Sequence, residues 1–150
     1  MIKLRKSGRS GPRRTTLRVE LDLDFSLAAI VCPLRDYRMA WQLNQNFRMQ
    51  LRRIEDMEVE GRRVGLSWFS RYCCESALDK SRIWLISNRS GGEYLIPERR
   101  NIDYFLLVRG GWYENRLPDL LSSVRLIPSV QTVFTEDPNA LRSRANLIQE

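Results

Sequence analysis

The chain of 150 residues contains 25 basic residues, 18 acidic residues and no histidine, which gives a formal net charge of +7. This length suits one domain with its own core, because a domain of about 150 residues buries roughly 70% of its unfolded surface. The absence of histidine removes the commonest general base near neutral pH, nucleophiles that histidine activates, and the usual zinc sites.

The apolar runs are short, well below the ~20 residues that a membrane helix needs. The N-terminus is basic but has no following apolar stretch, so we expect neither a secretory signal nor a membrane association. Cys32, Cys73 and Cys74 show neither metal-ligand nor disulfide spacing. These features predict a cytoplasmic protein without a bound metal or cofactor, in which the cysteines act as small apolar side chains.

The positive charge is concentrated at the N-terminus. The first fourteen residues contain six of the 25 basic residues and no acid, which leaves 19 basic against 18 acidic residues in the remainder. The six are Lys3, Arg5, Lys6, Arg9, Arg13 and Arg14. We predict a disordered arm at 1–15, because its apolar content is too low for folding, and a single domain at 16–150. The arm is either a solubilising tail or a contact for the phosphates of RNA or DNA.

Apolar and polar side chains alternate strictly over residues 17–27. The apolar positions are Leu17, Val19, Leu21, Leu23, Phe25 and Leu27. A period of two predicts a β-strand with one buried face, which residues 28–31 extend as a more buried end. Glu20, Asp22 and Asp24 lie on its opposite face, either solvated or paired with arginines of a neighbouring strand. Alternatively, they are carboxylate ligands of a metal ion in a hydrolase.

A helix is predicted to begin near Asp36, which can cap its N-terminus. Seven residues fall at helical spacing on one face: Tyr37, Ala40, Trp41, Asn44, Phe47, Leu51 and Ile54. The opposite side carries Arg38, Gln45, Arg48 and Arg52. The arginines form either a solvated face or a phosphate-binding row. Asn44 is either an amide with a satisfied partner or a ligand contact.

Several strands are predicted next. Strand-like stretches lie at 64–71 and 82–88 with a loop at 75–80 between them, and residues 88–92 form a hairpin turn before a short strand at 93–96. Pro97 interrupts the hydrogen-bond ladder after that strand. Residues 102–108 are apolar on both faces, which is typical of a central strand.

A second helix is predicted over about 115–126, with Pro118 tolerated in its first turn. Its inward face comprises Leu117, Leu120, Leu121 and Val124. Trp112 and Tyr113 precede it in a predicted loop, where they either fold back over the helix or contact a partner or a base.

The chain is predicted to end with a strand at 130–135 and a short docking helix from Asn139. The order of elements predicts an α+β protein. Its largely antiparallel sheet of five to six strands carries two helices on one face, in a ferredoxin-like or related arrangement.

The most distinctive motif lies between Leu95 and Arg109. Ile96-Pro97-Glu98 is followed, after three residues, by Ile102-Asp103-Tyr104. This pattern resembles the signature of the IPExxxVDY family of small bacterial proteins, with Ile102 in place of valine. Other stretches resemble the family in the same order: Leu23-Asp24-Phe25-Ser26-Leu27, Asp36-Tyr37-Arg38, Leu43-Asn44 and Ala145-Asn146-Leu147-Ile148. The resemblance covers most of the chain after residue 16. It implies a housekeeping setting but no particular activity and no catalytic residues.

Two interpretations of the signature residues stay open. Pro97 shapes the approach to the central strand, and the carboxylates of Glu98 and Asp103 either accept backbone N–H groups and hold an arginine, or face a ligand together with Tyr104. Asn44 is a further candidate for such a binding site. We expect Tyr104 to pack inward, with its hydroxyl group on a partner.

Because no catalytic constellation is evident, the sequence predicts a non-enzymatic interaction protein that binds a protein partner or its own copy. The alternative is an RNA-associated factor that uses residues 1–14, assisted by Arg38, Arg48 and Arg52. A third hypothesis is a carboxylate-metal hydrolase, to which Asp103 would add a ligand beside the carboxylates of the first strand.

Overall fold

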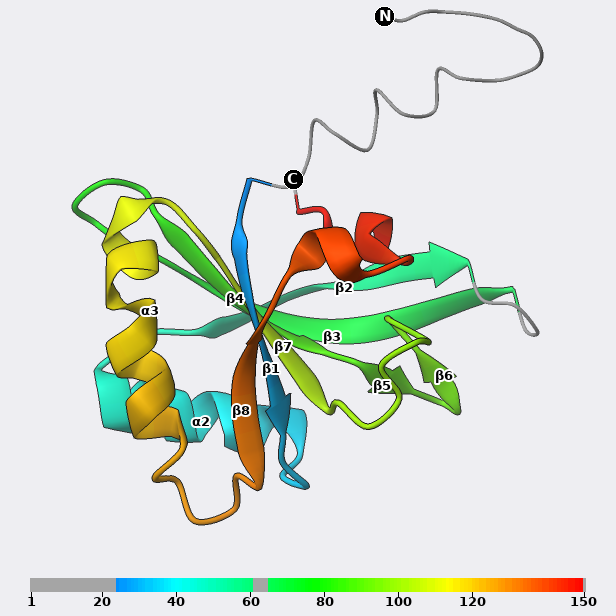
Figure 1. The fold of residues 1–150 in the computed structure, drawn as a ribbon, viewed down its shortest axis with the longest axis horizontal. Coiled ribbons are helices and arrows are strands. Elements are labelled where there is room, and N and C mark those ends of the chain that lie inside the picture. Colours follow the sequence, from blue (N-terminus) through cyan, green and yellow to red (C-terminus); the bar gives the residue numbers. More distant parts are fainter. Residues whose placement is uncertain (1–23, 61–64, 150) are drawn as a thin grey trace, which may run out of the picture.

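The computed structural model describes residues 24–60 and 65–149 (Figure 1). Within these residues, six strands form one antiparallel sheet in the order β2-β3-β4-β7-β1-β8. The strands are β1 (Ser26–Val31), β2 (Arg52–Glu60), β3 (Leu66–Glu75), β4 (Arg82–Ser87), β7 (Tyr104–Arg109) and β8 (Thr132–Glu136). The hairpin of β5 (Arg89–Ser90) and β6 (Glu93–Tyr94) forms a small second sheet. The predicted α+β class is confirmed.

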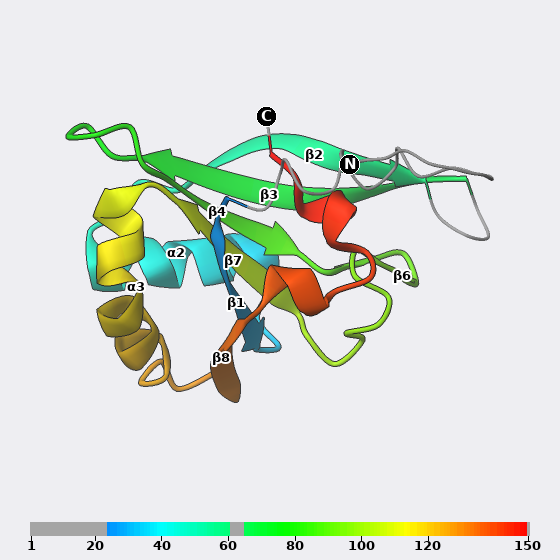
Figure 2. The ribbon, with the colours of Figure 1, turned by 45° about the horizontal axis from the view of Figure 1, so that its top comes forward.

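The two α-helices of the described chain are α2 (Asp36–Phe47) and α3 (Gly111–Val124), and both cover the same face of the sheet (Figure 2). The side chains that α3 buries there are the four that its sequence pattern predicts. They pack with inward side chains of the central strands, among them Ile83, Leu85, Leu106 and Val108. The prediction of two helices on one face is confirmed.

The opposite face of the sheet has a cover of its own. Two 3₁₀ helices, Pro138–Ala140 and Arg144–Leu147, form the C-terminal segment, where the sequence predicts a short docking helix. Their fully buried Leu141 and Leu147 pack against this face. The loop between β6 and β7 contributes further buried side chains, Leu95, Ile96 and Ile102. The sheet is therefore buried between two apolar layers.

The helical connections follow the split β-α-β pattern. The connection from β1 to β4 contains α2 and then the β2–β3 hairpin, and the connection from β7 to β8 contains α3. One strand lies between the members of each pair. Such connections are typical of ferredoxin-like folds, and β2 with β3 adds a hairpin at one edge of the sheet. The arrangement is thus consistent with the predicted topology.

The first helix ends earlier than its sequence pattern predicts. Arg48 adopts a left-handed conformation with φ of 55°, and β2 begins at Arg52. Leu51 and Ile54 therefore do not extend the helical face. A register shift between Ile54 and Met57 interrupts the alternation of β2, so its apolar residues imitate helical spacing.

The buried face of α2 also differs from the prediction. Met39, Ala40 and Leu43 are buried, whereas Tyr37 and Trp41 are 59% and 57% exposed. A surface helix tolerates single exposed aromatic residues, which makes its inward face hard to identify from hydrophobicity alone.

The predicted basic row does not form on this helix. Arg38 lies within α2, but Arg48 ends the helix and Arg52 belongs to β2. Asp36 is the first residue of the helix rather than its N-cap, which is Arg35, and its Oδ1 accepts the N–H of Tyr37 at 2.7 Å.

The helix α3 begins before the predicted residue 115, so Trp112 and Tyr113 lie in its first turn rather than in a loop. The Trp112 N–H donates to Asp79 Oδ2 and to Ser81 Oγ, each at 3.0 Å. The loop between β3 and β4 thus caps α3 from a distant part of the sequence. Pro118 lies inside the helix instead of in its first turn.

Some predicted features fall outside the described residues. These are the arm at 1–15 with its six basic residues, the first part of the predicted N-terminal strand, and Glu20 and Asp22. The end of that strand is present as β1, and Asp24 is exposed. In the part of the chain that the structure describes, no helix combines the length and apolar character of a membrane crossing.

We predict that Leu43→Ala lowers the free energy of unfolding by about 2–5 kcal/mol, because it opens a cavity beneath α2. Trp41→Ala, on the exposed side of the same helix, should change this free energy by only about 0.5 kcal/mol. Urea denaturation of both variants measures the difference. Equal destabilisation would contradict the assignment of the buried helix face.

Candidate functional site

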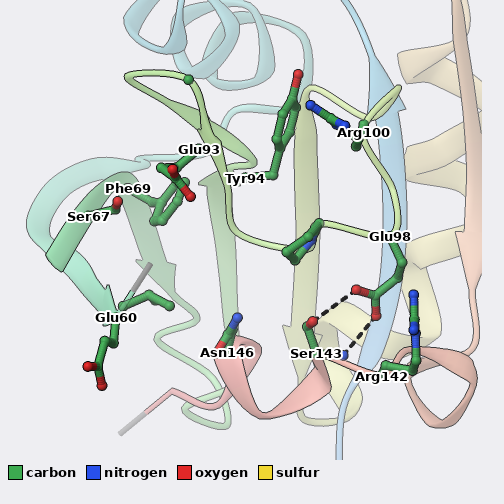
Figure 3. A pocket seen from close by; sticks show the side chains of 13 residues that line it. Glu60, Ser67, Phe69, Glu93, Tyr94, Glu98, Arg100, Arg142, Ser143 and Asn146 are labelled. Atoms are coloured by element: carbon green, nitrogen blue, oxygen red, sulfur yellow. Dashed lines mark hydrogen bonds between the residues drawn. The ribbon is translucent and has the colours of Figure 1, made fainter. Parts of the chain in front are cut away.

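An open groove of about 760 Å³ lies on the sheet face opposite the helices, at the end of the β2–β3 hairpin (Figure 3). Its floor is formed by Val59 of β2 with Ser67 and Phe69 of β3. The walls come from the β5–β6 hairpin, from residues 97–100 and from residues 142–146. Three parts of the chain that are distant in the sequence, the β2–β3 hairpin, residues 92–100 and residues 142–146, therefore meet at this site.

The floor combines apolar surface with one unpaired hydroxyl group. Val59 and Ser67 are cross-strand partners, and Phe69 lies two residues further along the same face of β3. Ser67 is only 7% exposed, yet its hydroxyl group has no hydrogen-bond partner within the described chain. The Ser67 oxygen keeps some contact with solvent in the groove, so this hydroxyl group is available to a ligand.

The two sides of the groove carry opposite charges. Glu60 and Glu93 lie on one side, and Arg100 and Arg142 lie on the other (Figure 3). The Arg100 guanidinium lies 4.9 Å from the centre of the Tyr94 ring. Neither arginine forms an ion pair with a carboxylate of the described residues. Their N–H donors therefore remain available at the edge of the groove.

Glu98 of the signature ties the C-terminal segment to the groove wall. Its carboxylate accepts the Ser143 N–H at 2.7 Å and the Ser143 hydroxyl at 2.9 Å. Partial burial raises the pKa of Glu98, but the hydrogen bonds from Ser143, together with the backbone N–H groups of Glu98 and Arg142, outweigh burial and hold the pKa below its usual range. The side chain is thus ionised near neutral pH and already engaged within the protein.

Asn88 fixes the signature segment to the end of β4. It is fully buried, and its Nδ2 donates to the carbonyl groups of Arg99 at 2.8 Å and Ile102 at 2.9 Å. Its Oδ1 accepts the Ile96 N–H at 2.8 Å, and its own carbonyl accepts the Leu95 N–H at 2.9 Å. From its sequence, Asn88 is predicted only as part of a hairpin turn, and this anchoring role is not predicted. The available signal was a polar amide directly after an apolar strand.

Asp103 and Tyr104 point away from the groove. Asp103 accepts the Cys32 N–H at 2.7 Å and Arg89 Nε at 2.8 Å, the contacts that the structural interpretation of this carboxylate expects. The Tyr104 hydroxyl donates to the Leu34 carbonyl at 2.5 Å, and burial raises the pKa of this tyrosine. The signature therefore divides: Pro97 and Glu98 line the groove, whereas the last two residues brace the chain before α2.

A second, smaller pocket of about 350 Å³ lies on the helix face, beside Tyr104 and the start of α2. Its charges largely compensate one another within the protein. Arg53 contacts Asp56 at 2.9 Å and Asp36 at 3.9 Å. This pocket consequently offers less unpaired charge than the groove.

The remaining candidate residues serve internal contacts. Asn44 binds the backbone of Leu51 with both amide atoms, its Nδ2 at 3.2 Å and its Oδ1 at 2.8 Å, and it lines neither pocket. The Tyr113 hydroxyl lies 3.2 Å from the sulfur of Cys74, and the Arg116 guanidinium covers the Trp112 ring. These contacts stabilise the junctions of the helices with the sheet.

The thiols and the acidic side chains of the described residues form neither an activated nucleophile nor a cluster of metal ligands. Burial raises the pKa of Cys32 and of Cys73, so both thiols are protonated near neutral pH. Among residues 24–60 and 65–149, no three side chains of the metal-ligating types come together. Of the predicted carboxylate cluster, Asp24 and Asp103 belong to these residues.

Comparison of the chain with protein-family models, with curated proteins and with solved structures gave no match. The resemblance to the IPExxxVDY family therefore stays a prediction. Function has to be inferred from the groove itself.

We predict that Asn88→Ala lowers the free energy of unfolding by about 3 kcal/mol or more. The change leaves two carbonyl groups and one N–H group without their partner, at roughly 1–3 kcal/mol each. Asn101→Ala, an exposed amide in the same loop, is the matched control and should be nearly neutral. Chemical denaturation measures both values, and a neutral Asn88→Ala variant would refute the anchoring role.

We also predict an acid-sensitive link at Glu98. Because its folded-state pKa is depressed, its contribution is fully present above the pKa of an unfolded glutamate, roughly pH 4–5. The contribution is lost as pH falls through the lower folded-state pKa. Glu98→Gln should therefore be less stable than the wild type by about 1 kcal/mol at pH 7, and the gap should close toward pH 3.

The control for this titration is Glu55→Gln, an exposed glutamate on β2 whose side chain makes no described contact. Thermal denaturation between pH 3 and pH 7 compares the three proteins. A gap between Glu98→Gln and the wild type that does not depend on pH would contradict the role of the ionised carboxylate.

Proposed function

We propose that the protein is a non-enzymatic interaction protein that holds a segment of a protein partner, or of a second copy of itself, in the groove. The floor is the observation that carries this proposal. Val59 supplies partly exposed apolar area above the buried ring of Phe69, and beside it Ser67 presents a hydroxyl group that no described residue satisfies. Apolar area with a few convergent polar groups is what a binding pocket needs, and the volume lies within the usual range of roughly 300–1,000 Å³.

The walls of the groove are held in place before any partner binds. Besides the contact between Glu98 and Ser143, the Asn146 Nδ2 donates to the Leu95 carbonyl at 2.8 Å. On the far side of the same loop, Arg99 Nε donates to Glu136 Oε2 at 2.6 Å. A preformed wall lowers the entropic cost of association, which supports a binding role.

The chemistry of the lining favours binding over catalysis. Among the described residues that line it there is no cysteine or lysine, and the whole chain has no histidine. Glu98 is kept ionised by Ser143, whereas a carboxylic general acid needs a raised pKa. The Ser143 hydroxyl donates to that carboxylate, whose lowered pKa makes it a weak base for the activation of a nucleophile.

The proposal predicts that a tagged wild-type protein captures a protein partner from the source cells even after nuclease treatment. A double variant, Arg100→Glu with Arg142→Glu, should reduce this capture about tenfold or more, because it reverses the charge of one rim. The matched control is Arg38→Glu with Arg48→Glu, which makes the same charge change on α2 and at its end. Quantitative mass spectrometry of the captured proteins gives the readout.

Three results would contradict this proposal or redirect it. Equal capture by the rim variant and the control would remove the groove as the binding site. Capture that nuclease abolishes would favour the RNA-associated alternative instead. Sedimentation of the purified protein shows whether the partner is a second copy, in which case the rim variant should be monomeric.

A further inference from the structure

The opposite charges of the two rims restrict what the groove binds. Glu60 is exposed at the end of β2 on one side, and Arg100 and Arg142 are exposed on the other (Figure 3). A ligand that crosses the floor meets both sides. A uniformly charged ligand is attracted by one rim and repelled by the other. Such a groove therefore favours ligands that carry opposite charges at the two positions facing the rims.

The arginine side is prepared for a carboxylate. Tyr94 is fixed by Arg89, whose Nη1 donates to the tyrosine hydroxyl at 3.1 Å, and Arg100 stacks on the same ring. Stacking holds a guanidinium by its face and leaves the N–H donors at its edge for an acceptor. The nearest acid of the lining, Glu98, is occupied by Ser143. A ligand carboxylate therefore meets little competition from within the protein.

The floor favours an extended chain. Val59, Ser67 and Phe69 lie on one face of two paired strands, so the floor is a flat strip with a single polar group. An extended peptide turns alternate side chains toward such a strip and keeps its backbone groups within reach of a hydroxyl. The Ser67 hydroxyl can donate to or accept from that backbone.

We infer that the groove binds an extended, dipolar peptide segment. An acidic side chain faces Arg100 and Arg142, an apolar side chain rests on the half-buried Val59, and a basic side chain faces Glu60. This inference rests on the proposed function and adds the chemical class of the bound segment.

Fluorescence polarisation with four labelled seven-residue peptides tests the inference. Each peptide has a central leucine between two flanking positions. The flanking residues are glutamate and lysine, two glutamates, two lysines, or two glutamines as the neutral control. Each of the four types is made with two spacings of the flanking residues, to allow for the length of the groove. The glutamate–lysine peptide should bind the wild-type protein at least about threefold more tightly than the other three.

A single variant should then switch the preference. Glu60→Arg replaces the exposed acid of one rim by a base while Glu93 remains, so the peptide with two glutamates should gain affinity and the glutamate–lysine peptide should lose its advantage. Glu55→Arg makes the same charge change on the same strand but outside the groove, and it should keep the wild-type preference. A merely structural role of Glu60 would weaken all peptides alike.

The outcomes separate the inference from the proposed function. Absence of peptide binding up to about 1 mM, or a preference that Glu60→Arg leaves unchanged, would overturn the dipolar specificity. If partner capture still depended on Arg100 and Arg142, the proposed function would stand without it. Loss of both peptide binding and rim-dependent capture would refute the two together.

Discussion

The buried amide of Asn88 is the interaction on which this architecture depends. A buried amide is tolerated only when its polar atoms are hydrogen-bonded, and here its partners are the backbone groups of the loop between β6 and β7. Most connecting segments run over the surface because their backbone groups need water. By supplying those hydrogen bonds, Asn88 lets Ile96 and Ile102 bury fully against the sheet.

This buried loop is part of the answer to a packing problem. The helices cover one face, and without a second cover Trp84, Phe105 and Leu107 would expose a large apolar area on the other. The loop and the C-terminal segment bury these side chains together. However, β2 and β3 are nine and ten residues long, whereas the central β4 and β7 have six each. The hairpin extends past its cover, and the groove lies where this cover ends, between the buried Phe69 and the exposed Glu60.

Local periodicity in the sequence was sufficient wherever neighbouring residues decide the structure. The apolar run of β7 and the inward face of α3 are examples, because their burial follows directly from side-chain spacing. The sequence pattern did not predict the ends of helices that are set by contacts with other segments. The first helix ends where Asn44 binds the backbone of Leu51, and α3 begins where Asp79 and Ser81 receive the Trp112 N–H. No periodic signal reports such contacts.

The candidate site was only partly predictable for the same reason. Pro97 and Glu98 stand out as a motif and do line the groove, but Ser67, Glu60 and Arg142 come from segments with no local signature. They become a site only when the C-terminal segment docks beside the hairpin. A charge pattern that three distant segments form together gives no local sequence motif, whereas a hydrogen-bonded turn does.

The residues of the groove wall differ in whether their side chains make internal contacts. Glu98 and Asp103 both point into the protein and hold backbone groups, one at the C-terminal segment and the other before α2. Arg100, which lies between them in the sequence, is exposed and free of acidic partners in the described chain. Glu98 and Asp103 therefore fix backbone groups on both faces of the sheet, and Arg100, which we propose contacts the ligand, lies between them in the sequence. Changing Arg100 should alter what is bound without unfolding the wall that presents it, since none of the wall's hydrogen bonds passes through its side chain.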